Sequence, residues 1–427
     1  MEATVSTRPV QGTGSNAWLL SFCVARGLFS MSQTTYAAAL PLLKQDWQMS
    51  AQQSGLVSSA YNFGFLISLF AVGFMADRIG AKRTYLGTSL VAAVSALAFA
   101  FFAKGFVSAF LLFGITGLFS GGSYTPGMHI LAERFPSKGR GRAIGFYIAA
   151  SSAGYALSLA LSSLMLAVSG WRTAFIVTCS GPVLGMVLGT WVLRHVPNVV
   201  PPRKADQGEA SMLQAVVTNK PSMLMILSYT FHSWEVLGLW AWSAFFLSYA
   251  VSGGAATAAG ASIGAALTAL AYVISMTGSI SGGMLSDRLG RTAVIGMMST
   301  LSAVCSFTMG WLVTAPFVLV VVILYVYQFA AIADSPVLST AQTELVPQRY
   351  LGASLSLRSV LGFGAGSVSP WVFGLLLDWG RATAGGSNTL GFGLAFSALG
   401  LGGVLCPLFI LWLRRLPEST RMAGGLR

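Results

Sequence analysis

The feature of this sequence that most restricts its fold is a series of long apolar stretches separated by short polar loops. An α-helix needs about 20 apolar residues to cross the roughly 30 Å hydrocarbon core of a bilayer. Lipid offers no hydrogen-bond partner to a free backbone group, so each stretch is predicted to cross as a helix. The stretches lie at about 17–40, 52–75, 84–103, 106–130, 143–168, 172–193, 221–250, 260–285, 293–314, 316–341, 353–377 and 389–413.

The composition also indicates a membrane protein. Only 9% of the 427 residues are charged and 55% are hydrophobic, whereas about 25% of the residues of a soluble domain are charged. The chain therefore lacks the polar surface of a soluble enzyme, a coiled coil, a disordered scaffold or a nucleic-acid-binding protein. We predict an all-α membrane protein with twelve transmembrane helices, surrounded by membrane lipids. The four cysteines lie inside apolar stretches and are expected as buried hydrophobic residues rather than as disulfides.

The net charge of +13 reflects an excess of basic residues. Their distribution along the chain predicts the orientation, because cytoplasmic loops carry an excess of Lys and Arg. One side of the predicted bundle receives four of them: Lys44, Lys104, Arg172 and Arg381. The other side receives nineteen: Arg8, Arg78, Lys82, Arg83, Arg134, Lys138, Arg140, Arg142, Arg194, Arg203, Lys204, Lys220, Arg288, Arg291, Arg349, Arg414, Arg415, Arg421 and Arg427. Both termini are therefore predicted to be cytoplasmic, with tails at 1–16 and 414–427. Short loops and the lack of an N-x-[ST] sequon favour a bacterial inner membrane.

An internal repeat organises the chain. Residues 73–80 (GFMADRIG) return as residues 283–290 (GMLSDRLG), at an offset of 210. The pair Thr125-Pro126 returns as Ser335-Pro336 at the same offset. Two unrelated patches with one offset predict a duplicated unit. We expect two six-helix bundles, at 17–193 and 221–413, that are related by a pseudo-two-fold axis and joined by a cytoplasmic linker at 194–220.

The repeated loop resembles the G-x-x-x-D-R/K-x-G-R/K-R/K motif of the major facilitator superfamily. The first copy departs from the motif at Ala81 and the second at Thr292. The resemblance covers nearly the whole chain and implies the fold of that superfamily, with twelve transmembrane helices in two pseudo-symmetric halves. It also implies a secondary transporter that works by alternating access, and we expect it to act as a monomer.

In that family these loops are linked to gating. A carboxylate near a helix N-terminus meets the positive end of the helix dipole, and a neighbouring Arg can hold it. We expect such contacts to latch the cytoplasmic face while the cavity opens outward; the alternative is that the basic residues only set the topology. The gating residues are Gly73, Asp77, Arg78, Gly80, Lys82, Arg83, Gly283, Asp287, Arg288, Gly290 and Arg291.

Ionisable residues inside the predicted spans cost about 2.5–3.5 kcal/mol each at a helix centre and so mark cavities or partners. Arg26 lies in the first span. Glu235 lies in the seventh span, one position from the residue that the offset of 210 makes equivalent to Arg26. We expect the two to face each other across a central cavity. Arg26 either binds an anionic solute, for which its planar guanidinium is suited, or forms a structural ion pair with Glu235.

The candidates for proton coupling are Glu235, His232 and Asp334. Burial disfavours the ionised form of Glu235 and makes it a plausible proton carrier. His232 lies on the same helical face, either as a relay or as a neutral, hydrogen-bonded residue. Asp334 in the tenth span could instead pair with Arg358 in the eleventh. Arg358 is expected either in that pair, snorkelling to the interface, or as a second contact for an anion.

Four further residues are predicted to contact the solute or to serve as packing: Tyr36, Asn62, Tyr147 and Trp240. Tyr147 is the repeat equivalent of Arg358 at an offset of 211.

The function predicted from these residues is secondary active transport of a small organic anion, coupled to protons through Glu235. No G-x-x-x-x-G-K-[ST] motif occurs, so ATP does not drive this chain. The alternatives are a polyspecific exporter of lipophilic compounds, which the missing G-P-x-x-G-G run of drug antiporters disfavours, and an uncoupled facilitator or exchanger. Three histidines at no ligand spacing predict no enzyme, no metal and no cofactor.

Overall fold

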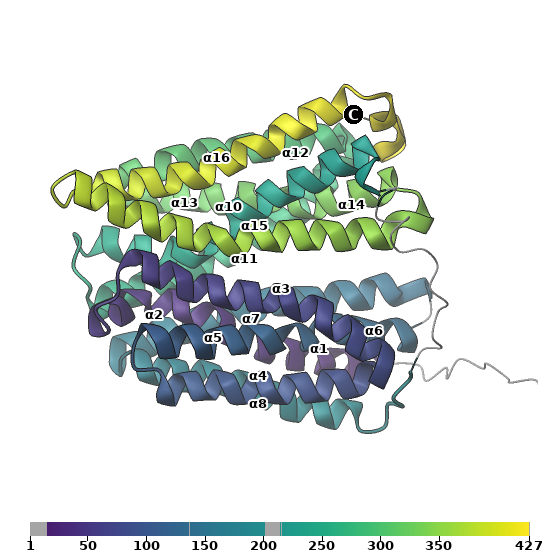
Figure 1. Cartoon of the computed structure of the whole chain (residues 1–427), viewed down its shortest axis with the longest axis horizontal. Helices are drawn as coiled ribbons and strands as arrows, with labels where there is room; N and C mark the ends of the chain where they lie inside the picture. The colour runs from purple at the N-terminus through teal and green to yellow at the C-terminus, as the bar shows by residue number, and fades with distance from the viewer. Residues whose placement is uncertain (1–14, 136, 201–213, 215, 427) are drawn as a thin grey trace, which may run out of the picture.

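The computed structural model describes residues 15–135, 137–200, 214 and 216–426. Most of the predicted tail at 1–16, residue 427 and the middle of the predicted linker at 194–220 lie outside the described residues. Arg8, Arg203 and Lys204 are among the basic residues that lie there. Figure 1 shows the described chain as a bundle of roughly aligned helices.

The first part of the chain, which we call the N-terminal half, consists of helices and short connections. They are α1 (Asn16–Ser30), α2 (Ser32–Asp46), α3 (Ala51–Ile79), α4 (Ala81–Phe102), α5 (Phe106–Ser120), the 3-10 turn η1 (Gly121–Ser123), α6 (Thr125–Arg134), α7 (Ser137–Val168) and α8 (Trp171–Leu193).

The C-terminal half has the same architecture. Its helices are α10 (Lys220–Val251), α11 (Ala258–Leu289), α12 (Arg291–Met309), η2 (Gly310–Leu312), α13 (Phe317–Ala333), α14 (Ser335–Leu345), α15 (Gln348–Thr383), α16 (Asn388–Arg414) and η3 (Pro417–Gly425).

Three pairs of helices run on end to end: α1 with α2, α5 with α6, and α13 with α14. The fifteen α-helices described above therefore form twelve rods, in agreement with the prediction. Ten of the rods are long and apolar enough to cross a membrane by length and composition alone. The first rod falls short because its break at Met31 leaves two pieces of 15 residues. The second rod outside these ten is α10, which is less apolar because it carries His232 and Glu235 among several Ser and Thr residues.

The repeat is visible in the backbone. Gly80 ends α3 with φ 91° and ψ 150°, and Gly290 ends α11 with φ 93° and ψ 153°. These left-handed angles are accessible to glycine at little cost. In two of the broken rods the second helix begins at equivalent residues, Thr125 and Ser335, and each is followed by a proline. Proline is tolerated in the first turn of a helix because the N–H that it lacks would have no partner there. Both features repeat at the offset of 210.

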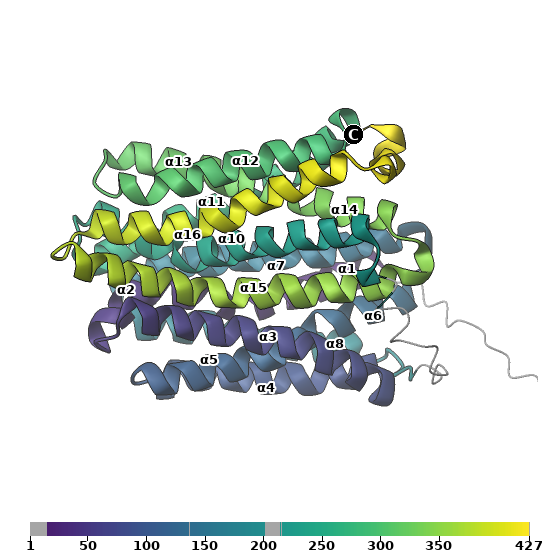
Figure 2. The same ribbon diagram turned by 45° about the horizontal axis from the view of Figure 1, so that its top comes forward.

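The two halves lie side by side, with the purple-to-blue helices of the N-terminal half below the teal-to-yellow ones in Figure 1. Helix α3 contacts α15, and α7 contacts α11, across the boundary between the halves. Figure 2 shows α3 and α15 adjacent from a second direction. We call the end of the bundle with the turns at Gly80 and Gly290 the motif end; η3 near the C-terminus lies there as well. The other is the opposite end.

At the opposite end the halves meet backbone to backbone. A Cβ atom on Gly55 of α3 would lie 2.1 Å from the carbonyl oxygen of Pro370 in α15, and one on Gly374 would lie 2.1 Å from that of Ala51. Only glycine permits this approach, as is usual for closely packed helices in membranes. The Asp378 carboxylate of α15 accepts hydrogen bonds from the first amides of α3, at Ala51 (3.0 Å) and Gln52 (2.8 Å). The seam between α3 and α15 is closed here.

Candidate functional site

A cavity of about 400 Å³ lies between the two halves, toward the motif end; we call it the inter-half cavity. The N-terminal half contributes α3, α6 and the residue before α6, and the C-terminal half contributes α10 and α15. Its lining residues are Leu66, Leu69, Phe70, Tyr124, Thr125, Met128, Tyr229, Leu355, Ser356, Arg358, Ser359 and Phe363. The lining is mostly apolar and aromatic, and Arg358 is its one charged member.

Arg358 reaches the cavity without a carboxylate partner among the residues that the structure describes. Its Nη1 donates a hydrogen bond to the Ser339 hydroxyl at 3.1 Å, and its guanidinium carbon lies 4.2 Å from the centre of the Tyr229 ring. Its Nε is buried and has no hydrogen-bond partner within the described residues. The expected ion pair with Asp334 does not form, because Asp334 pairs with another residue.

That residue is His232. Its Nδ1 lies 3.0 Å from Oδ1 of Asp334, and both side chains are buried. His232 also lies one helical turn from Tyr229, with ring centres 5.7 Å apart. Arg358, Tyr229, His232 and Asp334 therefore form a continuous row of contacts that leads from the cavity into the C-terminal half. We call it the Arg358–Asp334 row.

Arg26 lies behind the opposite wall of the cavity. It is 5% exposed, and its Nε and Nη1 donate hydrogen bonds to the hydroxyls of Ser151 (2.8 Å) and Ser123 (2.5 Å). Its guanidinium carbon lies 5.4 Å from the centre of the Tyr124 ring, which lines the cavity. No carboxylate pairs with Arg26 in the part of the chain that the structure describes. The hydrogen-bond partners of the guanidinium are thus neutral hydroxyl acceptors.

Glu235 does not face Arg26, contrary to the expectation from the repeat. Its carboxylate points away from the inter-half cavity toward α16, where a Cβ on Gly403 would lie 2.7 Å from its Oε2. Ser302 of α12 and Tyr327 of α13 are its polar neighbours. Glu235 is one position short of the symmetry mate of Arg26, and one residue turns a helix by about 100°. That shift turns Glu235 toward the interior of its own half, away from the inter-half boundary.

Three of the predicted solute contacts lie around a second, smaller cavity of about 40 Å³, nearer the opposite end: Tyr36, Asn62 and Trp240. Tyr36 is buried, and its hydroxyl donates a hydrogen bond to the carbonyl of Ser54 at 3.2 Å. The space is far below the several hundred Å³ typical of a small-molecule site. These residues are therefore separate from Arg358 in this conformation.

Tyr147 lines neither cavity, so of its two predicted roles the structure favours packing over solute contact. It is fully buried, stacks on Phe22 at 4.9 Å and donates a hydrogen bond to the carbonyl of Ser123 at 2.5 Å. It supports the turn whose hydroxyl holds Arg26. The equivalence with Arg358 did not carry over, because Tyr147 packs inside the N-terminal half.

Tyr124 and Tyr229 were missed by the sequence reasoning, although both line the cavity beside an arginine. A signal existed for each of them. Tyr124 directly precedes the repeated Thr125-Pro126 pair, and Tyr229 lies one turn before His232.

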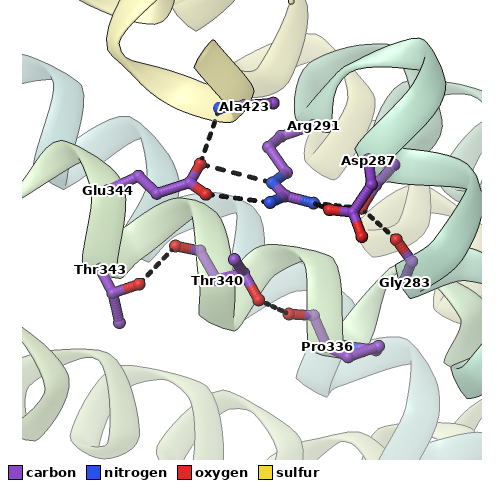
Figure 3. Close-up of polar contacts among 9 residues, drawn as sticks. Gly283, Asp287, Arg291, Pro336, Thr340, Thr343, Glu344 and Ala423 are labelled. Atoms are coloured by element: carbon purple, nitrogen blue, oxygen red, sulfur yellow. Dashed lines mark hydrogen bonds and ion pairs between the residues drawn. The ribbon is translucent and has the colours of Figure 1, made fainter.

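The gating motif of the C-terminal half forms a charged cluster, shown in Figure 3. Arg291 donates from Nη1 to Asp287 at 2.5 Å and to Ser286 at 2.7 Å, and from Nη2 to Glu344 of α14 at 2.9 Å. Glu344 also accepts a hydrogen bond from the amide of Ala423 at 3.0 Å. The cluster ties α11, α12, α14 and the C-terminal segment together within one half.

The motif of the N-terminal half is held by the start of the predicted linker. Lys82 donates to the carbonyl of Val196 at 2.7 Å, and Asn198 donates to the carbonyl of Ile79 at 2.7 Å. Asp77, Arg78, Arg83 and Arg288 are exposed. The expected latch across the two halves does not appear in the described residues, since the contacts of each motif stay within its own half. This fits an arrangement in which the seam is closed at the opposite end instead.

The chain was compared with protein families and known proteins. Residues 22–370 match the model of the Major Facilitator Superfamily. The chain is 24% identical to a probable sulfoacetate transporter of Cupriavidus necator, over 95% of this chain and 96% of that protein. It is 23% identical to a hexuronate transporter of Bacillus subtilis, over 86% and 89%, and 24% identical to a cis,cis-muconate transport protein of Acinetobacter baylyi, over 93% and 95%.

Solved structures share the fold. The D-xylose-proton symporter superposes with a TM-score of 0.77 at 18% identity, over 94% of this chain and 98% of that chain. A bacterial homologue of the lysosomal transporter Spinster, in an inward-facing and occupied conformation, gives a TM-score of 0.73 at 16% identity, over 93% and 96%. With a family model that spans most of its length and a fold of two pseudo-symmetric halves, this chain belongs to the major facilitator superfamily and is a multi-pass membrane transporter.

Proposed function

We propose that this transporter moves a small organic anion by alternating access, and that the anion binds in the inter-half cavity. The observation that carries the proposal is the pair of arginines at this cavity for which the described residues provide no carboxylate partner. Arg358 lines it and Arg26 lies directly behind Tyr124. A charge kept inside a membrane without a counter-ion marks a ligand site.

The size and lining of the cavity suit such a solute. Its volume of about 400 Å³ falls in the range of small-molecule sites, roughly 300–1,000 Å³. A guanidinium can hold a carboxylate or sulfonate by two parallel hydrogen bonds. The aromatic rings of Tyr124, Tyr229 and Phe363 would pack against the apolar part of the solute. The relatives named above for sulfoacetate, hexuronate and cis,cis-muconate all carry the names of organic anions.

We further propose that transport is coupled to protons through the Arg358–Asp334 row, with Glu235 as a second carrier. An anion that binds Arg358 changes the electrostatic potential at His232, because only the Tyr229 ring lies between the two side chains in this row. The His232–Asp334 pair can take up or release a proton in response, because a histidine side chain can serve as a proton shuttle. Glu235 lies one helical turn beyond His232 and has a buried Oε1 with no hydrogen-bond partner in the described chain.

We propose that the motif end faces the cytoplasm of a bacterial inner membrane, since most of the basic loop residues lie there. The inter-half cavity then belongs to an inward-facing state with the outer seam closed. The bundles at 17–193 and 221–413 would rock about the cavity, joined by the linker at 194–220. In the outward-facing state the exposed Asp77, Arg78 and Arg288 would close the motif end.

The test is ligand-induced thermal stabilisation of the purified full-length protein. Sulfoacetate, cis,cis-muconate and gallate are compared with lipophilic cations in the wild type, Arg358→Gln and Arg26→Gln. We expect saturable stabilisation by one anion class and at least about tenfold weaker binding in Arg358→Gln, because a charge-assisted hydrogen bond contributes about 1.5–3 kcal/mol.

Arg172→Gln is the matched control, since Arg172 lies over Trp171 at the opposite end and outside both cavities. It should bind as the wild type does. Stabilisation by lipophilic cations alone, unchanged in Arg358→Gln, would overturn the anion proposal in favour of drug export.

A further inference from the structure

A third cavity, of about 300 Å³, opens between the halves at the opposite end; we call it the outer vestibule. The N-terminal half contributes the end of α2 and the residues that follow it, and the C-terminal half contributes α10, the loop after α10, and α15. Its lining residues are Pro41, Lys44, Gln45, Gln48, Met49, Phe245, Ser248, Tyr249, Gly254, Ala255, Ala256 and Arg381. Two of the four basic residues assigned to this side of the bundle, Lys44 and Arg381, therefore meet in one cavity.

Neither of these cations forms a direct ion pair with a carboxylate in the described residues. The guanidinium carbon of Arg381 lies 5.4 Å from the centre of the Tyr249 ring, and its buried Nε has no hydrogen-bond partner. Lys44 is half-buried, and the positive charge of Arg381 acts on it. Two like charges from opposite halves are thus held close together in a partly dehydrated space. Their repulsion is unfavourable, and a bound anion between them would relieve it.

A nearby carboxylate, that of Asp378, already accepts hydrogen bonds from another helix. Asp378 lies one helical turn before Arg381 on α15, and its negative charge acts on both Lys44 and Arg381. Both of its oxygens accept hydrogen bonds from the first amides of α3, at Ala51 and Gln52. Asp378 therefore stabilises the end of α3. Arg381 also contacts the Tyr249 side chain, and its buried Nε remains without a hydrogen-bond partner among the described residues.

We propose that the outer vestibule is a second anion-binding site, in which Lys44 and Arg381 together hold a carboxylate or sulfonate. The Gln45 and Gln48 amides, together with the Ser248 and Tyr249 hydroxyls, line the same space and provide neutral donors. The apolar remainder of the solute would rest on Phe245 and Met49. A space of about 300 Å³ is at the lower limit of small-molecule sites, so it suits a compact acid.

The site has a mechanical consequence, because its two cations come from different halves. A bound anion joins α2 to α15 next to the Asp378 contact and favours the closed seam. In the empty site the charges of Lys44 and Arg381 repel each other, which favours opening. The site itself depends only on its own residues; its role in delivering the solute to the inter-half cavity rests on the proposed function. An outer site of this kind would raise the local concentration of anions before the halves rock.

The test uses a single thiol introduced by Gln45→Cys in the full-length protein. The four native cysteines are buried, so a membrane-impermeant maleimide reports on the introduced thiol. The labelling rate is measured with increasing sodium sulfoacetate or sodium sulfate, against sodium chloride at equal ionic strength. We expect saturable protection by the two oxyanions, with the half-protecting concentration raised about tenfold or more in Lys44→Gln and Arg381→Gln.

Three further variants separate the sites. Lys44→Arg keeps the charge and should keep the protection. It tests the role of the charge at position 44 even if Lys44→Gln does not fold. Lys104→Gln removes a cation from an exposed position at the same end and should change nothing. Arg358→Gln should keep the protection while losing binding in the inter-half cavity, so the two sites can fail independently.

The proposal is overturned by either of two results. The first is that sulfoacetate and sulfate protect no better than chloride. The second is that protection disappears in Arg358→Gln and persists in Lys44→Gln, which would trace it to closure around the inter-half cavity.

Discussion

The buried ionisable residues of this protein differ in what surrounds them, and the difference suggests their roles. Arg26 is held by the hydroxyls of Ser123 and Ser151, and its charge has no carboxylate partner in the described chain. Asp334 has His232 as its partner at 3.0 Å. A buried charge without a counter-ion is costly, whereas a paired one is tolerated. We therefore assign the arginines to the anion and the His232–Asp334 pair to the proton.

Asp334→Asn tests that assignment at the scale of one residue. The amide cannot take up a proton, so accumulation driven by a pH gradient should fall about tenfold or more, in line with the loss of a proton-transfer group. Exchange of labelled for unlabelled solute across proteoliposomes needs no net proton movement and should persist. Both rates are measured on the same preparation.

Glu133→Gln is its control, since Glu133 is an exposed carboxylate at the motif end. An equal loss of exchange and of driven uptake in Asp334→Asn would show that Asp334 supports binding or folding rather than coupling.

Among the helices, the breaks within rods position the site. The rod of α5 and α6 is interrupted at Gly121–Tyr124, and the rod of α13 and α14 at Asp334. Tyr124 and Asp334 thus occupy equivalent breaks in the two halves, one on the wall of the inter-half cavity and the other at the end of the Arg358–Asp334 row. The repeated proline in the following turn allows each new segment to start.

The contact between α3 and α15 leads to a prediction about helix packing. Gly55→Ala would place a Cβ 2.1 Å from the backbone oxygen of Pro370, and backbone cannot give way as a side chain can. Overpacking of this kind costs about 1–3 kcal/mol. We expect the closed seam to be disfavoured and the rate of solute uptake to fall several-fold.

Gly87→Ala is the matched control, because a Cβ at Gly87 in α4 meets no atom within 4 Å. It makes the same change in helix propensity without the clash. Uptake by Gly55→Ala at the rate of Gly87→Ala would contradict the tight closure of this seam.

On the scale of the whole molecule, the two ends are held by different contacts. The opposite end is closed by glycine packing and by Asp378 across the halves, whereas at the motif end the charged contacts stay within each half. The molecule therefore has one end closed and a large cavity toward the other. Alternating access requires these contacts to break and others to form at the motif end.

Asp378→Asn should weaken the closed end. A carboxylate at a helix N-terminus contributes about 0.3–1 kcal/mol, so its loss should shift the population toward opening about two- to fivefold. The labelling rate of Ser58→Cys reports this, because Ser58 lines the small cavity beneath the closed seam. We expect the rate to rise by that factor.

Asp46→Asn serves for comparison. Asp46 is a carboxylate of the same end that accepts a hydrogen bond from Trp171 within the N-terminal half. It should leave the labelling rate unchanged. A rate in Asp378→Asn that matches Asp46→Asn would show that glycine packing alone closes the seam.

The amino-acid sequence by itself determined the helical class, the twelve rods and the repeat. Apolar stretches long enough to span a bilayer must become helices, since lipid cannot satisfy a free backbone group. A duplicated motif with the same offset in two patches implies two similar halves, and the angles of Gly80 and Gly290 agree within a few degrees.

Only the tertiary structure decided the partners of the buried charges. The sequence predicted that Arg26 faces Glu235 and gave Asp334 as one of the alternatives for Arg358. Neither pair forms in the described structure. Depth along a helix can be counted from the sequence, but the direction of a side chain turns by about 100° with each residue. A helix tilt or a one-residue shift therefore decides whether a side chain lines a cavity, as Tyr124 does, or packs inside one half, as Tyr147 does.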